Sequence, residues 1–252
     1  MPDTIYSSVA SVYDSLNSEV DYGAWADFIT KTVEKYKTVP TSLALDLACG
    51  TGGMTFALRE RGYDMTGVDN SPEMLAVAAE RCQKDGIEDV LLLLQDMTSF
   101  ELYGTVDFAV CCLDSLNHLT STADLEKCLA LVHNYVVPGG LFIFDLNTPY
   151  KFENIYGDKA YVLEDGSTLV AWQNYYSKKR GTCDFFISEF TENADGTYRR
   201  EDSRLRERCY SMRTVKRLLA ECGFEILFVS SDYSEAPPSP DAERWYFTAR
   251  RL

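Results

Sequence analysis

A regular alternation of short apolar runs with longer amphipathic segments is the feature that most constrains the fold of this chain. Nearly continuous apolar runs of strand length are typical of strands that are covered on both faces, and helical segments between them form the crossovers of a parallel sheet. The expected strands are residues 43–47, 65–68, 90–94, 106–113 and 141–145. The sequence therefore predicts an α/β protein around a doubly wound, mostly parallel sheet.

Start and stop signals place the helices between these strands. Ser71-Pro72-Glu73 combines an N-cap, a first-turn proline and an acidic side chain near a helix N-terminus. A second helix is expected over residues 121–135 and should stop at the Pro-Gly-Gly of residues 138–140. Apolar residues at helical spacing between positions 22 and 33 predict a further helix near the N-terminus.

From residue 161 to residue 210 the pattern changes to alternation with turn signals, which predicts an antiparallel β-meander rich in aromatic residues. A helix that begins at Ser211 and strands at 224–230 and 244–250 then resume the main sheet and bring it to seven strands. We expect one domain from residues 1–150 and 211–252, with residues 1–40 as a helical cover. Residues 151–210 are expected to be an inserted lid or substrate region, whose aromatics could line a pocket, pack internally or form a homodimer interface.

Charge and cysteine content exclude some functions. The net charge of −15 disfavours binding to nucleic acid or to anionic membranes, which depends on clustered Lys and Arg. The eight cysteines show no paired metal or disulfide spacing, and the chain shows neither a signal region nor a membrane-length apolar run. We therefore expect a cytoplasmic protein. Two histidines are too few for a histidine-based metal cluster, and no metal is predicted.

The stretch LALDLACGTGG at residues 43–53 places a carboxylate just before a glycine-rich turn at the end of the first strand. Such a turn lets backbone amides approach a ligand where ligands bind in sheets of this kind. Asp46 disfavours a pyrophosphate there and favours a ligand with positive charge. Asp69, at the end of the second strand, suits the ribose of an adenosine, whether the ligand is NAD or another adenosine cofactor.

These residues resemble the class I S-adenosylmethionine-dependent methyltransferases. The resemblance rests on the turn at residues 46–52 and continues in order through residues 67–75, 95–97 and 112–118. It implies a Rossmann-like fold and S-adenosylmethionine as the cofactor. Ala48 stands where many members have glycine. This difference matters little if the Ala48 backbone lies outside the left-handed region, whereas a positive φ would weaken the match at this position. The implied cofactor-binding residues are Asp46, Ala48, Cys49, Gly50, Gly52, Asp69, Asn70, Met74, Asp96, Met97 and Leu113, with Tyr13 near the methionine end.

Methyl transfer to an amine or a hydroxyl requires alignment with the sulfur–methyl axis and the loss of a proton. His118, at the expected end of the fourth strand, is the candidate base, and Asp114 or Asn117 is the candidate group that orients the acceptor. The alternative for His118 is a hydrogen-bonded residue at a helix entry. For Asp69 and Asp96 the alternative is that each caps the helix that follows it.

The favoured function is methyl transfer to a small molecule, with nitrogen preferred over oxygen because an acidic protein attracts amines. One alternative is an NAD-dependent oxidoreductase, which the spacing Ala48-x-Gly50-x-x-Gly53 leaves open; the Tyr175-x-x-x-Lys179 pair typical of one such family falls in an expected strand. Another alternative is a protein that binds the cofactor or a partner without turnover. Residues 147–150, Asn-Thr-Pro-Tyr, resemble a signature of nucleic acid amino-methyltransferases and are interpreted as a turn.

Overall fold

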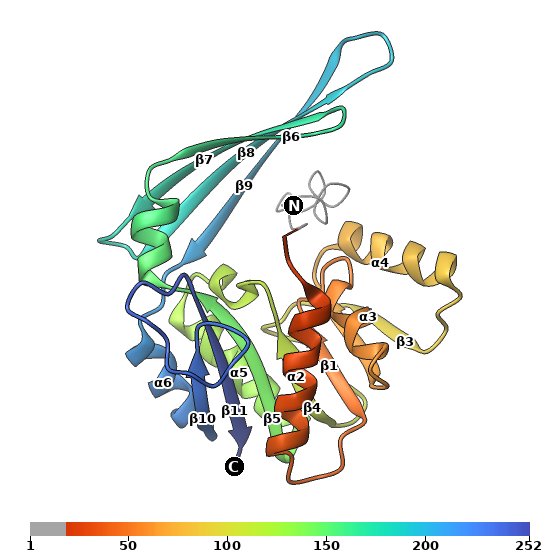
Figure 1. The fold of residues 1–252 in the computed structure, drawn as a ribbon, viewed down its shortest axis with the longest axis vertical. Coiled ribbons are helices and arrows are strands. Elements are labelled where there is room, and N and C mark those ends of the chain that lie inside the picture. Colours follow the sequence, from red (N-terminus) through yellow and green to blue (C-terminus); the bar gives the residue numbers. More distant parts are fainter. Residues whose placement is uncertain (1–18) are drawn as a thin grey trace.

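The computed structural model describes residues 19–252, and its centre is one seven-stranded sheet (Figure 1). The strand order is β10-β11-β5-β4-β1-β2-β3, and β11 alone runs antiparallel to its neighbours. The predicted doubly wound α/β fold, with a mostly parallel sheet of seven strands, is confirmed. The strands are β1 Leu43–Leu47, β2 Asp64–Asp69, β3 Val90–Leu94, β4 Val106–Cys111, β5 Val136–Asn147, β10 Phe224–Ser230 and β11 Arg244–Arg251.

Helices cover both faces of this sheet. Successive residues of a strand point to opposite sides, so strands that are apolar throughout need cover on both faces. Trp25 and Ile29 of α2 pack on one face with Ala44 of β1, in a core that α3 also joins. On the other face, α5 and α6 share a core with the neighbouring strand residues Leu45 and Ala109. The helices are α2 Tyr22–Tyr36, α3 Gly53–Arg59, α4 Pro72–Asp85, α5 Thr122–Tyr135 and α6 Met212–Glu221. None of the helices in the described part of the chain is long and apolar enough to cross a membrane.

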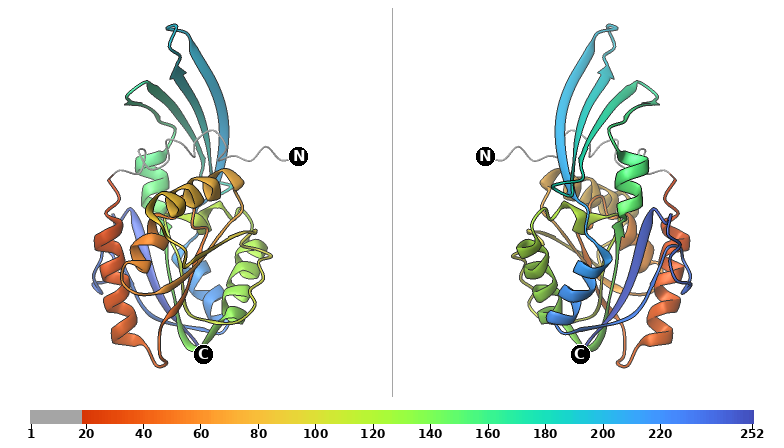
Figure 2. Two further views of the ribbon diagram at one scale, coloured as in Figure 1. Left: turned by 90° about the vertical axis from the view of Figure 1, so that its right-hand side faces the viewer. Right: turned by 90° about the vertical axis from the view of Figure 1, so that its left-hand side faces the viewer.

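A second, four-stranded antiparallel sheet projects from one end of the main sheet (Figures 1 and 2). It begins after a short π-helix, η2 Lys151–Tyr156, and the chain then returns to the main sheet through α6. At its root, Phe152 of η2 packs against Cys183 and Phe185. The predicted meander is therefore present. Its strands are β6 Ala160–Asp165, β7 Thr168–Ser177, β8 Thr182–Glu192 and β9 Tyr198–Arg208.

Two strand boundaries differ from the prediction for physical reasons. β5 begins at Val136 rather than at residue 141, so the Pro-Gly-Gly that ends α5 already lies in the extended strand. Gly140 permits this, since a Cβ atom there would lie 2.4 Å from the carbonyl oxygen of Asp107. β4 ends at Cys111 rather than at residue 113, because the backbones of Leu113 and Asp114 turn into the left-handed region with φ of 56° and 52°.

Candidate active site

Asp46 is a buried carboxylate inside the carboxyl end of β1. Its side chain is 1% exposed and accepts a hydrogen bond of 2.6 Å from the hydroxyl of Thr55, on α3. Burial raises the pKa of Asp46 to about 7, against the opposing effect of the Thr55 hydrogen bond. The carboxylate therefore lacks the counter-charge that a buried anion normally has, and a cationic ligand group would supply one.

Asp69 joins the end of β2 to the glycine-rich turn. One carboxylate oxygen accepts a hydrogen bond from the amide of Gly50 at 2.8 Å, and the other accepts one from the amide of Ser71 at 2.8 Å. Burial raises the pKa of Asp69, and these hydrogen bonds oppose the rise. The side chain that caps α4 is that of Ser71, so Asp69 links two loops and does not simply cap the helix that follows.

The turn itself is more strained than expected. Ala48 has φ of 59°, so its backbone lies in the left-handed region and the match of Ala48 to the family pattern is weakened. Gly50 and Gly52 also have positive φ, at 55° and 85°, and the tight reversal therefore needs left-handed backbone at three positions. For an alanine this conformation costs roughly 1–2 kcal/mol. A strained turn of this kind is a frequent feature of ligand-binding loops.

The other predicted cofactor residues follow the ends of β1, β2, β3 and β4 along one edge of the sheet. Asn70 is exposed directly after Asp69, whereas Met74 is buried in the first turn of α4. Asp96 accepts hydrogen bonds from the backbone amide and the hydroxyl of Thr98, so it closes a turn and caps no helix. Cys49 is buried, Gly52 precedes α3, and Met97 and Leu113 are partly buried against the two cores. Tyr13 lies outside the described residues.

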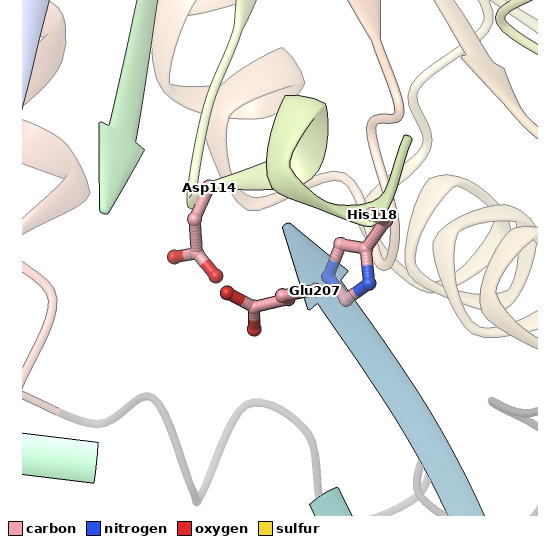
Figure 3. Close-up of side chains that lie close together, drawn as sticks. All are labelled: Asp114, His118 and Glu207. Atoms are coloured by element: carbon pink, nitrogen blue, oxygen red, sulfur yellow. The ribbon is translucent and has the colours of Figure 1, made fainter. Parts of the chain in front are cut away.

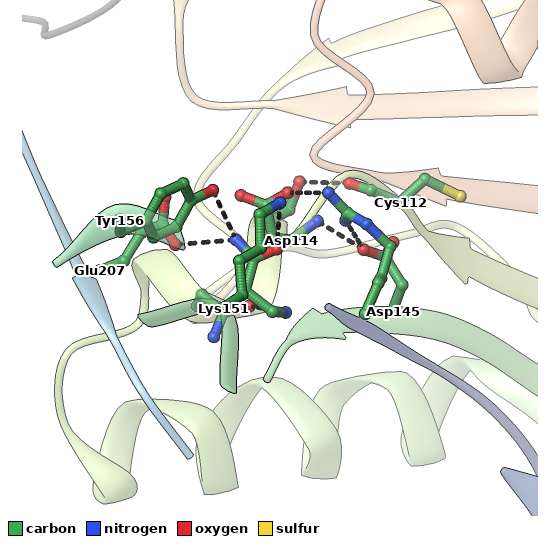
Figure 4. Close-up of polar contacts among 10 residues, drawn as sticks. Cys112, Asp114, Asp145, Lys151, Tyr156 and Glu207 are labelled. Atoms are coloured by element: carbon green, nitrogen blue, oxygen red, sulfur yellow. Dashed lines mark hydrogen bonds and ion pairs between the residues drawn. The ribbon is translucent and has the colours of Figure 1, made fainter. Parts of the chain in front are cut away.

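A second group of polar residues lies at the ends of β4, β5 and β11, and Figure 4 shows Asp114 and Asp145 close together within it. Arg244 joins these two carboxylates. The guanidinium donates to Asp114 at 2.8 Å and also to Asp145, which is fully buried. The backbone amide of Asp114 donates to Asp145 at 2.8 Å. Leu113 and Asp114 have left-handed backbone conformations, and this turn directs the Asp114 amide toward Asp145. The strained backbone after β4 therefore positions Asp114.

The charged side chains in this group shift one another's pKa values. Burial favours the neutral form of Arg244, but the charges of Asp145 and Asp114 outweigh it and hold the pKa of Arg244 well above its usual value. Burial would raise the pKa of Asp114, but the positive charges of Arg244 and Lys151 keep it below its usual value. For Asp145, burial exceeds the effect of Arg244 and the pKa is raised.

The inserted region contributes Glu207, from the last strand of its sheet, to the same place. This side chain is 5% exposed and accepts a hydrogen bond of 3.1 Å from the side-chain amide of Asn147. The same amide lies 3.1 Å from the hydroxyl of Tyr156, and its oxygen accepts a hydrogen bond of 3.0 Å from Lys151. Burial lowers the pKa of Lys151, and Arg244 lowers it further. Asn147, which sequence reasoning treats as part of a turn, is thus a central contact between the main sheet and the insertion.

His118 stands beside the two acids Asp114 and Glu207 (Figure 3). One nitrogen or carboxylate oxygen from each of the three residues lies within 4.8 Å of the others. Burial lowers the pKa of His118, against the opposing charge of Asp114, so the imidazole is neutral at neutral pH and able to accept a proton. Three such residues could hold a metal ion, which a count of histidines alone does not reveal. Asp114 already pairs with Arg244, however, and we assign no metal to them.

Asn117 is fully buried, and both the nitrogen and the oxygen of its side-chain amide form hydrogen bonds with the backbone. Its nitrogen donates to the carbonyl oxygen of Arg208 at 2.8 Å, and its oxygen accepts from the amide of Asn147 at 2.9 Å. It therefore ties the loop after β4 to β5 and to the end of β9. This geometry gives Asn117 a structural role, and its role in orienting an acceptor stays a prediction.

Sequence reasoning missed six polar residues of this second group, although some of them interrupt an apolar pattern and could have been noticed for that reason. Asp145 and Asn147 interrupt the end of an apolar strand, and Glu207 shares the inner face of its strand with Leu205 and Cys209. The pairing that brings them together is long-range and has no sequence signature. The six residues are Asp145, Asn147, Lys151, Tyr156, Glu207 and Arg244.

Cys112 is influenced by both groups of polar residues, the one that contains Asp46 and the one that contains Asp145. Burial, followed by the charges of Asp46 and Asp145, raises the pKa of the Cys112 thiol, and Arg244 opposes the rise. One thiol at the end of β4 is therefore under the influence of both groups. Together they define a class of α/β protein with a glycine-rich, acidic turn at the ends of β1 and β2 and a second acidic group at the ends of β4 and β5.

Comparison with known proteins agrees with this class. Residues 44–140 match the family model described as a methyltransferase domain. A solved S-adenosylmethionine-dependent methyltransferase from Clostridium acetobutylicum is 30% identical, with a TM-score of 0.87 and 98% of each chain covered. A Bacillus subtilis (strain 168) protein whose name places it among the methyltransferases is 31% identical over 98% of this chain and 97% of its own length. The chain belongs to the S-adenosylmethionine-dependent methyltransferases.

A more distant relative is named for its substrate. The dTDP-3-amino-3,6-dideoxy-alpha-D-glucopyranose N,N-dimethyltransferase of Streptomyces fradiae is 28% identical and covers 71% of this chain and 69% of its own length. Family membership makes this protein an enzyme that uses S-adenosylmethionine. The oxidoreductase and the non-catalytic binding protein, which the sequence left open, are thereby set aside.

Proposed function

We propose that this enzyme transfers a methyl group to the nitrogen of a small-molecule amine. The observation that carries the proposal is the grouping of His118 with Asp114 and Glu207, whose nitrogen and carboxylate oxygens lie within 4.8 Å of one another. Carboxylates attract a protonated amine, and a neutral imidazole can take part in removing its proton. The net charge of −15 favours the approach of cationic acceptors, and the N-methylating relative from Streptomyces fradiae supports nitrogen as the acceptor atom.

For the cofactor we propose a site along the ends of β1, β2 and β3. Asp69 would accept hydrogen bonds from the ribose hydroxyls, Asp46 would face the ammonium group, and Asp96 with Met97 would contact the adenine. The buried and unpaired charge of Asp46 and the position of Asp69 beside the amide of Gly50 support this arrangement. When bound, S-adenosylmethionine supplies an electrophilic methyl group on a sulfonium.

On the acceptor side, the residues of the chain hold the amine and remove a proton. His118 is half-buried at the end of η1 Ser115–His118, from which it can pass a proton to water. Asp114 is fixed by Arg244 and by its own strained backbone, so its carboxylate presents a fixed charge. Because methyl transfer is an in-line displacement, such fixed positioning is the main contribution expected of the protein.

The insertion, residues 151–210, is proposed to be the lid or substrate region. Its inner face carries Glu207 to the site, while Tyr175 and Phe186 are exposed on the opposite face, beside a depression of about 640 Å³. We propose that this outer face pairs with a second copy of the chain. Sedimentation of the wild type and of Phe186→Arg tests the pairing: a wild-type dimer that dissociates in the variant supports it, and a wild-type monomer contradicts it.

The proposed reaction is tested with S-adenosylmethionine labelled with ¹³C in the methyl group. The purified protein is incubated with matched acceptors that differ only in an amino or a hydroxyl group, such as D-glucosamine and D-glucose, within a wider panel of such pairs. Label on nitrogen in one or more amines, with the matched alcohols unlabelled, supports the proposal. Label on the alcohols, with the amines unlabelled, contradicts it.

A further inference from the structure

The buried polar residues at the ends of β4, β5 and β11 have unequal charges. We call Asp114, Asp145, Lys151, Glu207 and Arg244 the strand-end cluster; it holds three acids and two bases. Arg244 satisfies two of the acids, Asp114 and Asp145. Lys151 donates to Asn147 and not to Glu207. Among residues 19–252, no Lys or Arg side chain forms an ion pair with Glu207, which leaves the cluster one positive charge short when all five groups are ionised.

Glu207 is the acid that lacks a cation. It is 5% exposed, and its carboxylate accepts a hydrogen bond from the neutral side-chain amide of Asn147. Burial and the nearby charge of Asp114 both raise its pKa well above the usual value. A buried carboxylate of this kind is stable either when it holds a proton or when a cation lies against it.

We propose that Glu207 binds the protonated amine of the acceptor and takes the proton that must leave before methyl transfer. This inference rests on the proposed function and adds a second catalytic residue to it. The ammonium gives one N–H proton to the Glu207 carboxylate, and the nitrogen keeps the electron pair of that bond. The free pair then forms the N–CH₃ bond while the S–CH₃ bond breaks, its electrons staying on sulfur. The proton leaves Glu207 for water by way of His118.

The size of the missing charge favours a monovalent cation over a divalent metal. One ammonium would bring the strand-end cluster to neutrality, whereas a divalent ion would leave a buried excess of positive charge beside Arg244 and Lys151. Asp114 is also fixed on Arg244 at 2.8 Å, so a metal would have to compete with a guanidinium. An ammonium needs only hydrogen-bond acceptors, which Glu207 and His118 provide.

The groups that act on Glu207 come from each element packed around it. They are Asp114 after β4, His118 at the end of η1, Asn147 at the end of β5, Lys151 and Tyr156 on η2, Arg244 at the start of β11 and Cys183 on β8. Tyr156 keeps its proton because burial and the charge of Glu207 raise its pKa well above the usual value. Lys151 and Arg244 lower the pKa of Glu207 but do not cancel the effect of burial.

The test compares Glu207→Gln with Glu201→Gln, which removes the same charge from the same strand and the same face. Glutamine keeps an oxygen that can accept from Asn147, and S-adenosylhomocysteine binding together with thermal unfolding reports whether the variant is folded. Near pH 7 we expect turnover to fall 10²–10⁴-fold in Glu207→Gln, with cofactor affinity unchanged. Glu201→Gln should behave like the wild type.

Two acceptor amines of different basicity separate a catalytic role from a structural one. A weakly basic amine arrives largely unprotonated, so its turnover should depend much less on Glu207 than that of a strongly basic amine. A structural defect would slow both acceptors equally. Equal deficits, or wild-type turnover of both amines by Glu207→Gln, would overturn the inference while leaving amine methylation itself intact.

A binding measurement tests the amine site without turnover. Methylammonium chloride is titrated into the complex with S-adenosylhomocysteine, with sodium chloride as the salt control, and the ¹³C carboxyl signal of Glu207 is followed by NMR. We expect saturable binding that displaces the proton of Glu207 and is lost in Glu207→Gln. If this holds while no amine is methylated, the amine site stands and the proposed function fails; if methylammonium leaves the Glu207 signal unchanged, the inference fails.

Discussion

The backbone amide of Asn147 donates a hydrogen bond of 2.9 Å to the side-chain oxygen of Asn117. Both residues are fully buried, and the nitrogen of Asn117 reaches across to the carbonyl oxygen of Arg208 in the inserted sheet. One amide side chain therefore fixes the loop after β4, the end of β5 and the strand that carries Glu207. The position of the acidic second site depends on this contact.

Replacing Asn117 with alanine should destabilise the protein by about 2–3 kcal/mol, because the amide of Asn147 would be left buried without a partner. Turnover should also fall, since the end of β9 would be less well fixed. Urea unfolding measures the first effect. Asn134→Ala, at an exposed position of α5, is the control and should change stability by less than about 0.5 kcal/mol. If Asn117→Ala is as stable as the wild type, the hydrogen bonds of the Asn117 side chain are dispensable for stability.

Asp46 should make stability depend on pH. Its pKa in the folded protein is about 7, against a usual value of 3.8, so the folded state holds this proton more tightly than the unfolded chain does. The free energy of unfolding should therefore fall as pH rises from about 4 to 7 and level off above, by at most about 4 kcal/mol. Denaturant titrations at several pH values measure it. In Asp46→Asn this part of the decline should disappear, and an identical decline in both proteins would refute the assignment.

Ala48→Gly should stabilise the protein. The alanine is held at φ of 59°, and removing its Cβ relieves that strain, partly offset by the greater freedom of glycine in the unfolded chain. We expect a gain of up to about 1 kcal/mol in thermal or urea unfolding, with cofactor binding retained. The control, Ala44→Gly, changes a buried alanine in β1 and should lower stability. A loss of stability in Ala48→Gly would contradict the strained turn.

His118→Ala should reduce turnover by 10²–10⁴-fold while the affinity for S-adenosylhomocysteine is unchanged, because a neutral imidazole in the acceptor site is removed. Initial rates and calorimetry on the same preparation measure both quantities. His133→Ala, in α5, removes the other histidine and should remain active. Near-normal turnover in His118→Ala would remove this residue from the mechanism and leave it a structural role.

The arrangement of the proposed cofactor half of the site could be predicted from the sequence because its parts are local. The turn after β1, Asp69 at the end of β2 and Ser71 directly before α4 each lie where a strand revealed by periodicity ends. The acceptor half could not be predicted, because Arg244 lies 130 residues along the chain from Asp114 and only the sheet order brings them together. Glu207 was hidden for a related reason: β9 is rich in charge, and only pairing shows that this position faces inward.

The central claim is that the turn after β1 and Asp69 form the cofactor site, and a calorimetric titration tests it directly. S-adenosylhomocysteine is titrated into the wild type, Asp69→Ala and Asp64→Ala, the last of which removes an exposed carboxylate at the start of the same strand. We predict binding to the wild type and to Asp64→Ala, and about 10- to 100-fold weaker binding to Asp69→Ala, the loss expected for hydrogen bonds to a charged group. Equal affinity in all three proteins would show that the cofactor binds elsewhere.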